Sequence, residues 1–152
     1  MPAKRPKKVV AAAPRAAAKQ VGDLRALLPG HRDSADRLCW RFGHADADGP
    51  WSLGKLTKAE VDALGEAMVK FESMTVTELF KGSPGKDYEV ARIPNKDALA
   101  RLDEIQLSDM TQISCLRIGG KGRLYGFRVD NVFHLVWWDP EHEVWPTEKK
   151  HT

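Results

Sequence analysis

Residues 112–138 decide the fold of this chain and read QISCLRIGGKGRLYGFRVDNVFHLVWW. Three apolar and aromatic segments are separated by the short links GGKG and DN. Glycine, asparagine and aspartate tolerate the positive φ angles of tight turns, so both links are typical of β-hairpins. The stretch therefore predicts an antiparallel three-stranded meander that ends at Asp139.

Alternation along each predicted strand divides the residues of the meander between two faces. In the middle strand it places Arg123 and Tyr125 on one face and Leu124 on the other. In the last strand it places Phe133, Leu135 and Trp137 on one face, and Val132, His134, Val136 and Trp138 on the other. Both faces carry large apolar side chains, so we expect both to be mostly covered.

Two elements are expected in the first part of the domain. RLCWRF, residues 37–42, alternates apolar and polar side chains as a half-buried strand does. A helix is expected over 57–74, because Thr57 and Glu60 form a capping-box pattern ahead of an apolar stripe. The stripe consists of Val61, Leu64, Met68 and Phe71.

Three further elements precede the meander. TVTELF, residues 75–80, indicates a short helical turn, and YEVARI, residues 88–93, indicates a strand that Pro94 ends. Asn95 is the expected N-cap of a second helix that runs to about Leu107. We expect Leu99, Leu102 and Ile105 to face inward on this helix, and Arg101, Asp103 and Glu104 to face outward.

These elements predict a single α+β domain over residues 34–152. Its N-terminal strand and two main helices are expected to accompany the C-terminal antiparallel meander sheet, with the helices packed on one face of that sheet. The length of 152 residues allows one such domain plus a tail.

The N-terminal region differs from the rest of the chain in charge. Residues 1–20 hold six of the 24 basic side chains and no acidic one, whereas the other 132 residues carry 18 basic and 21 acidic side chains, a net charge of −3. A segment rich in Pro, Ala and Lys buries too little apolar area to offset its ordering entropy, so residues 1–30 are expected to form a basic, largely disordered tail. Such a tail either contacts nucleic-acid phosphates or serves solubility.

Several classes of site and location are not expected. Cys39 and Cys115 lack CxxC spacing, which argues against a disulfide scaffold and fits a cytoplasmic protein. No apolar run approaches the roughly 20 residues that span a bilayer, so we expect no membrane association. Asp46 and Asp48 resemble the start of a calcium loop, but Pro50 stands where a third oxygen ligand is needed. We expect neither a metal nor a cofactor.

The segment after the meander, WDPEHEVWPTEKKHT, gathers acids and bases in a short stretch. His142 lies between Glu141 and Glu143, and nearby carboxylates favour a protonated imidazole that can donate a proton. In the alternative interpretation the segment is only structural: Asp139 caps backbone amides, and Trp145 covers the edge of the sheet. Both interpretations remain open at this point.

Residues 116–146, LRIGGKGRLYGFRVDNVFHLVWWDPEHEVWP, together with the terminal KKHT, resemble the C-terminal half of small uncharacterised bacterial and phage proteins. The order strand, helix, helix and three-stranded meander resembles the RelE/ParE-like superfamily of toxins from toxin–antitoxin systems. That resemblance implies a RelE-like fold and a toxin that cleaves mRNA on the ribosome as a metal-independent endoribonuclease. It also implies an antitoxin or another protein as a partner.

The resemblance further implies roles for particular residues. Arg117 and Arg123 match the strand arginines that bind and neutralise the scissile phosphate. Lys149, Lys150 and His151 match the C-terminal catalytic stretch, and His142 is the alternative acid or base in their place. The expected catalytic residues are thus Arg123, His142 and His151, and the expected substrate-binding residues are Arg117, Lys149, Lys150 and Tyr125.

A second hypothesis assigns no catalytic activity to the chain. In it the domain is a non-enzymatic interaction module that binds a protein partner through its Trp-rich sheet and C-terminal turn, with Trp138 and Trp145 as contact residues. The basic tail would then add affinity for nucleic acid.

Overall fold

The computed structural model describes residues 37–147, which belong to one compact unit, Asp36–Thr152. The predicted tail, residues 1–30, lies outside the described residues, and so do Lys149, Lys150 and His151. Among the helices of residues 37–147, none is long and apolar enough to cross a membrane.

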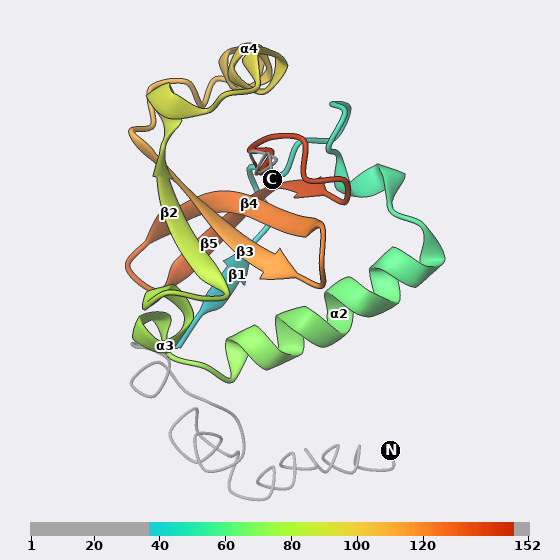
Figure 1. Ribbon diagram of the computed structural model, residues 1–152, viewed down its shortest axis with the longest axis vertical. Helices are drawn as coiled ribbons and strands as arrows, with labels where there is room; N and C mark the ends of the chain where they lie inside the picture. Colours follow the sequence, from blue (N-terminus) through green and yellow to red (C-terminus); the bar gives the residue numbers. More distant parts are fainter. Residues whose placement is uncertain (1–36, 148–152) are drawn as a thin grey trace, which may run out of the picture. The chain divides into compact units, whose positions relative to one another are not determined.

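The described part of the chain is an α+β structure built on a mixed five-stranded sheet (Figure 1). The strands are β1 (Cys39–Arg41), β2 (Gly85–Glu89), β3 (Gln112–Ile118), β4 (Gly122–Val129) and β5 (Val132–Asp139). The helices are α2 (Lys58–Glu72), α3 (Val76–Phe80) and α4 (Lys96–Glu104), with short 3₁₀ turns η1 (Leu53–Lys55) and η2 (Val90–Arg92). The strand order is β1-β5-β4-β3-β2; β1 runs parallel to β5, and the other neighbours are antiparallel.

The predicted meander is confirmed as β3, β4 and β5, which form the centre of the sheet. Both of its turns use left-handed backbone, as the sequence indicated. Gly119 has a φ of 67° in the first turn and Asp130 a φ of 54° in the second. The N-terminal strand is also confirmed, although β1 contains only three residues.

Helix α2 begins as predicted. The Thr57 side chain accepts a hydrogen bond from the Glu60 backbone amide, and the Glu60 carboxylate accepts one from the Thr57 amide. Leu64 and Phe71 are buried beneath the helix. Val61 is half exposed, so the predicted apolar stripe is narrower than expected. Asn95 caps α4 through two backbone amides, also as predicted.

The prediction that the helices pack on one face of the sheet is wrong. One core cluster joins α2 and α3 to the side of the sheet that carries Leu116 and Leu124. A second cluster joins α4, Trp51 and the chain after β5 to the opposite side, which carries Tyr125. Because both faces of the central strands are apolar, each face needs its own cover.

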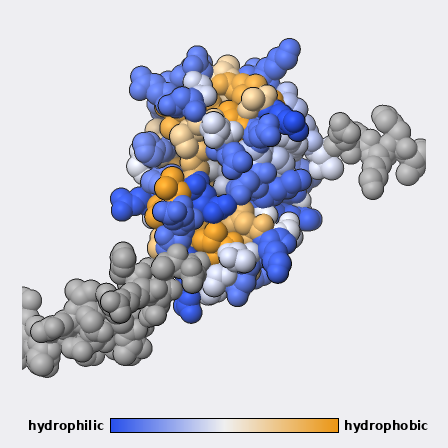
Figure 2. Space-filling model, turned by 90° about the vertical axis from the view of Figure 1, so that its left-hand side faces the viewer, coloured by the Kyte–Doolittle hydropathy of each residue, from blue (hydrophilic) through white to orange (hydrophobic). Residues whose placement is uncertain are grey.

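The predicted strand over 88–93 is shifted. Strand β2 starts at Gly85 and ends at Glu89, and the chain then turns into η2. Val90 and Ile93 are both buried in the same cluster. A 3₁₀ turn places residues three apart on one side, whereas a strand would place these two on opposite sides. Figure 2 shows the molecule from the side of the edge strand β2: hydrophilic side chains cover much of the middle, and apolar areas lie at the top, along the left margin and towards the bottom.

The faces predicted for the end of β5 are also wrong. The register shifts between Tyr125 and Gly126 of β4, which leaves Val136 as an extra residue on β5. One extra residue reverses the alternation that follows it. Trp137 therefore packs on the side of α4, and Trp138 packs on the side of α2.

Candidate functional site

The strand register brings three charged residues into one row across the sheet. Arg117 of β3 lies opposite Arg123 of β4, and Arg123 lies opposite Asp139 of β5. Side chains directly opposite each other have Cβ atoms about 4.5–5.5 Å apart. Arg117 and Arg123, here called the arginine pair, therefore present two guanidinium groups at one end of the sheet, on the side that α4 covers.

The arginine pair is held by backbone carbonyls of the turn between β3 and β4. Nη1 of Arg123 donates to the carbonyls of Gly120 at 3.2 Å and Gly122 at 2.9 Å, and Nε of Arg117 donates to Gly119 at 3.3 Å. Within residues 37–147, neither arginine forms a salt bridge. The neighbouring carboxylate of Asp139 instead accepts backbone amides. Within the described residues, the pair therefore keeps donors that no carboxylate accepts at salt-bridge distance.

His142 lies beside the arginine pair in the turn that follows β5. It has a φ of 59°, which is uncommon for a residue other than glycine or asparagine. An ion pair of 3.5 Å between Lys121 and Glu141 joins this turn to the turn between β3 and β4. Nδ1 of His142 lies 3.2 Å from the Thr147 hydroxyl oxygen. In the tautomer in which Nδ1–H donates to this hydroxyl, Nε2 is the nitrogen that can accept a proton.

The expectation that neighbouring glutamates keep His142 protonated is wrong. Burial lowers the pKa of His142, and the positive charges of Arg123 and Arg117 lower it further, against an opposing effect of Asp139. Glu141 is engaged with Lys121, and Glu143 accepts from the Trp51 indole. His142 is consequently neutral near neutral pH and suited to accept a proton.

The predicted structural turn after β5 is confirmed. The Asp139 carboxylate accepts the amides of Glu143 at 3.0 Å and Val144 at 2.8 Å, although burial raises its pKa. Trp145 stacks on Tyr88 of the edge strand β2. The structural and the functional interpretations are thus compatible, because the turn that Asp139 holds is also the turn that carries His142.

Tyr125 lies on the predicted face but not at the surface. Its side chain is only 1% exposed and packs in the cluster beneath α4, so direct contact with a substrate does not agree with its burial. It lies opposite Cys115, whose pKa burial raises to about 12. A thiol with this pKa stays protonated and unreactive near neutral pH.

The predicted catalytic stretch at the C-terminus stays a prediction, because Lys149, Lys150 and His151 lie outside the described residues. The sequence did not single out Lys86, which the register places opposite Cys115, next to the row of the arginine pair. The position of Lys86 follows only from the pairing of β2 with β3. The sequence-based prediction placed the strand that corresponds to β2 at residues 88–93, too late in the chain to include Lys86.

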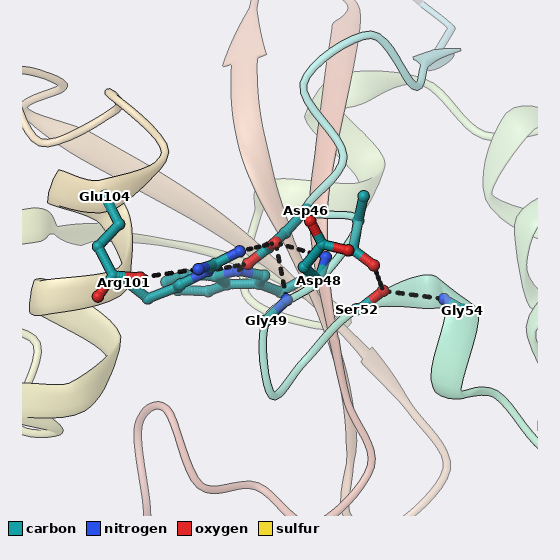
Figure 3. A network of polar contacts seen from close by, with 9 residues as sticks. Asp46, Asp48, Gly49, Ser52, Gly54, Arg101 and Glu104 are labelled. Carbon is teal, nitrogen blue, oxygen red and sulfur yellow. Dashed lines mark hydrogen bonds and ion pairs between the residues drawn. The ribbon is translucent and has the colours of Figure 1, made fainter.

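Asp46 belongs to a different polar network, drawn in Figure 3. Its carboxylate accepts Nε of Arg101 at 2.8 Å and Nη2 of Arg101 at 2.7 Å, and it also accepts the Trp137 indole at 3.0 Å and the Gly49 amide at 3.0 Å. The prediction that Arg101 faces outward is therefore wrong. The guanidinium of Arg101 holds the pKa of Asp46 well below its usual range.

No group of three or more His, Cys, Asp or Glu side chains within residues 37–147 is arranged to hold a metal ion. Asp46 was considered above as the first residue of a calcium loop. Its carboxylate instead accepts hydrogen bonds from Arg101 and Trp137.

The tryptophans bear on the hypothesis of an interaction module. Trp138 is 6% exposed and lies in the core on the side of α2. It does not offer the contact surface that this hypothesis assigned to it. Trp145 is only half-buried and remains accessible in part.

Comparison with known proteins adds no assignment: no family model, no curated protein and no solved structure matches this chain.

Proposed function

We propose that this protein is a metal-independent endoribonuclease that binds an RNA phosphate at the arginine pair. The observation that carries the proposal is the placement of Arg117 directly opposite Arg123, with no salt bridge to either within residues 37–147, beside a neutral His142. Guanidinium groups suit phosphate oxygens because their planar donors match the geometry of the anion.

The placement of two arginines directly opposite each other lowers the stability of the sheet. Like charges directly opposite each other on a sheet destabilise it by up to about 1 kcal/mol. Nearby acids are engaged elsewhere, Glu141 with Lys121 and Asp139 with backbone amides. An anionic ligand would remove the repulsion, which makes the pair better suited to binding than to stability.

The reaction follows from these groups. Nε2 of His142 accepts the proton of a ribose 2′-hydroxyl, and the 2′-oxygen attacks the adjacent phosphorus. Arg117 and Arg123 stabilise the added negative charge of the phosphorane. The bond from phosphorus to the 5′-oxygen breaks, and that oxygen takes a proton from a second acid. The products are a 2′,3′-cyclic phosphate and a 5′-hydroxyl end.

We assign the second acid to the C-terminal stretch that contains Lys149, Lys150 and His151. This assignment rests on the sequence, where the three residues follow the described turn within four positions of Thr147. A lysine or a protonated histidine can donate to the leaving oxygen.

Cleavage of single-stranded RNA by the purified full chain, with a chelator present, tests the proposal. The expected products carry 2′,3′-cyclic phosphate ends, and Arg123→Ala reduces their rate of formation by about 100-fold or more. Arg41→Ala is the matched control, since Arg41 is exposed on β1 and pairs with His134 near the other end of β5. Intact RNA with folded wild-type protein would refute the proposal.

A cellular experiment complements the assay. Induced expression of the wild type in a bacterial host should arrest growth and degrade mRNA, and Arg123→Ala and His142→Asn should do neither. Asparagine is chosen because it tolerates the left-handed backbone at position 142 better than alanine does. Normal growth with intact mRNA would contradict a toxin.

A further inference from the structure

An aromatic pair lies on the same side of the sheet as the arginine pair. Tyr88 of β2 and Trp145 of the C-terminal turn stack with ring centroids 4.1 Å apart and planes inclined by 22°. Both residues pack against the core beneath α4 and are only partly buried. Nζ of Lys86 lies 5.1 Å from the centroid of the Tyr88 ring. We call Lys86, Tyr88 and Trp145 the aromatic ledge.

The register gives the position of the ledge relative to the arginine pair. Tyr88 lies opposite Ile113 and Lys86 lies opposite Cys115, which are four and two positions before Arg117 on β3. Four residues of a strand span about 13 Å. Nucleotides stacked as in a duplex strand advance about 3.4 Å each, so a chain with a phosphate at the arginine pair reaches the ledge within about four nucleotides.

We propose that the aromatic ledge binds an unpaired base of single-stranded RNA, which stacks on Trp145 while Lys86, whose Nζ lies over the Tyr88 ring, contacts a backbone phosphate of the same strand. This inference rests on the proposed function, because it assigns the substrate of the same site. Aromatic rings bind any base through its π-face, and cations beside them follow the phosphate backbone. The ledge combines both features.

The same features select single strands over duplexes. Bases within a helix are stacked on one another and cannot add to a protein stack, whereas bases of loops and ends can. Lys86 is exposed and forms no salt bridge within residues 37–147, so its charge remains for a phosphate. The ledge therefore predicts a base-dependent contribution that the arginine pair alone does not provide.

The test measures binding of the full chain to two short oligomers, with fluorescence anisotropy as the readout. One is a 2′-O-methylated oligouridylate, which cannot be cleaved because its 2′-oxygen carries no proton. The other has the same length and backbone but lacks bases. Trp145→Ala should weaken binding of the oligouridylate about 10-fold and leave binding of the abasic oligomer unchanged. Arg123→Ala should weaken both.

Three further variants keep the test decisive. Trp145→Phe retains a smaller ring and should lose less affinity than Trp145→Ala, which covers the case in which alanine at this position unfolds the protein. Lys58→Ala on α2 is the matched control for Lys86→Ala, since the Lys58 side chain is 91% exposed on the other side of the sheet.

The outcomes separate the ledge from the proposed function. Wild-type protein that binds the two oligomers equally, or binds duplex RNA as well as the single strand, would overturn the ledge and leave phosphate binding intact. Wild-type protein that binds neither oligomer would overturn both. Quenching of tryptophan fluorescence by the oligouridylate, lost in Trp145→Phe, would support the ledge.

Discussion

Two groups of charged side chains on the same side of the sheet have opposite surroundings. Asp46 and Arg101 meet through two hydrogen bonds of 2.8 and 2.7 Å, and Trp137 and backbone amides occupy the remaining acceptor positions of the carboxylate. Arg117 and Arg123 face each other, and their side chains donate to carbonyls of the turn between β3 and β4, with no carboxylate partner recorded in the part of the chain that the structure describes. In the first group the positive and negative charges are paired, whereas in the second neither guanidinium has a carboxylate partner within residues 37–147.

The difference separates charge that serves the fold from charge that is free to bind. A buried carboxylate is stable only when donors satisfy it, so Asp46 and Arg101 hold the loop before η1 against α4. Guanidinium groups that lie near an exposed turn and form no salt bridge within residues 37–147 carry little of the folding energy. We therefore expect substitutions in the first group to change stability, and substitutions in the second group to change activity.

The largest expected effect on stability comes from Asp46→Ala. The substitution removes the acceptor for Arg101, for the Trp137 indole and for the Gly49 amide at once, so we expect a loss of about 3 kcal/mol in the free energy of unfolding. Chemical denaturation measures it. Asp62→Ala, which breaks an exposed ion pair with Lys58, is the control and should cost under about 1 kcal/mol. Similar values for both variants would remove the distinction between the two groups.

Lowering the pH should weaken the contribution of the Asp46 carboxylate to stability. The pKa of Asp46 is lower in the folded than in the unfolded chain, so its contribution to stability is complete above the unfolded value of about 3.9 and is lost as the pH falls towards the folded value. The difference in stability between the wild type and Asp46→Asn should therefore shrink below about pH 4. A difference that is constant with pH would show that Asp46 is not held in its charged form.

The next effect concerns activity rather than stability. His142→Asn should lower RNA cleavage by about 100-fold or more, with little change in the unfolding midpoint. In the wild type the cleavage rate should rise with pH as His142 loses its proton and level off above its pKa, which lies below the ordinary value of about 6.5. A rate that falls over this range would identify His142 as the acid instead of the base.

A smaller effect is expected from Arg101→Lys. Lysine keeps the charge but cannot bond both oxygens of Asp46 in the parallel geometry of the guanidinium. The variant should be less stable than the wild type and more stable than Asp46→Ala, which thermal unfolding can rank. Stability equal to that of Asp46→Ala would mean that the geometry of the pair, and not its charge, carries the effect.

Local patterns in the sequence were sufficient for most of the elements. The capping box at Thr57, the cap at Asn95 and the two turns of the meander depend on neighbouring residues, and each was predicted correctly. The faces of β5 could not be derived in the same way. The bulge at Val136 depends on the pairing with β4, and no feature of β5 alone reveals it.

The site was predictable to a smaller extent. Alternation placed Arg123 and Tyr125 on one face, but the burial of Tyr125 depends on α4 and the C-terminal turn. Asp46 and Arg101 are 55 positions apart, so their contact has no local signature. The protonation of His142 was misjudged because the two neighbouring glutamates point to other partners, while distant arginines lie beside the ring.

The central claim is that the arginine pair serves a ligand and not the fold. The most direct test measures unfolding and RNA cleavage on one preparation of Arg123→Ala beside the wild type. We predict a free energy of unfolding within about 1 kcal/mol of the wild type, because a repulsion is relieved and no salt bridge among residues 37–147 is lost, together with a loss of cleavage of about 100-fold. A large loss of stability, or cleavage at the wild-type rate, would contradict the claim.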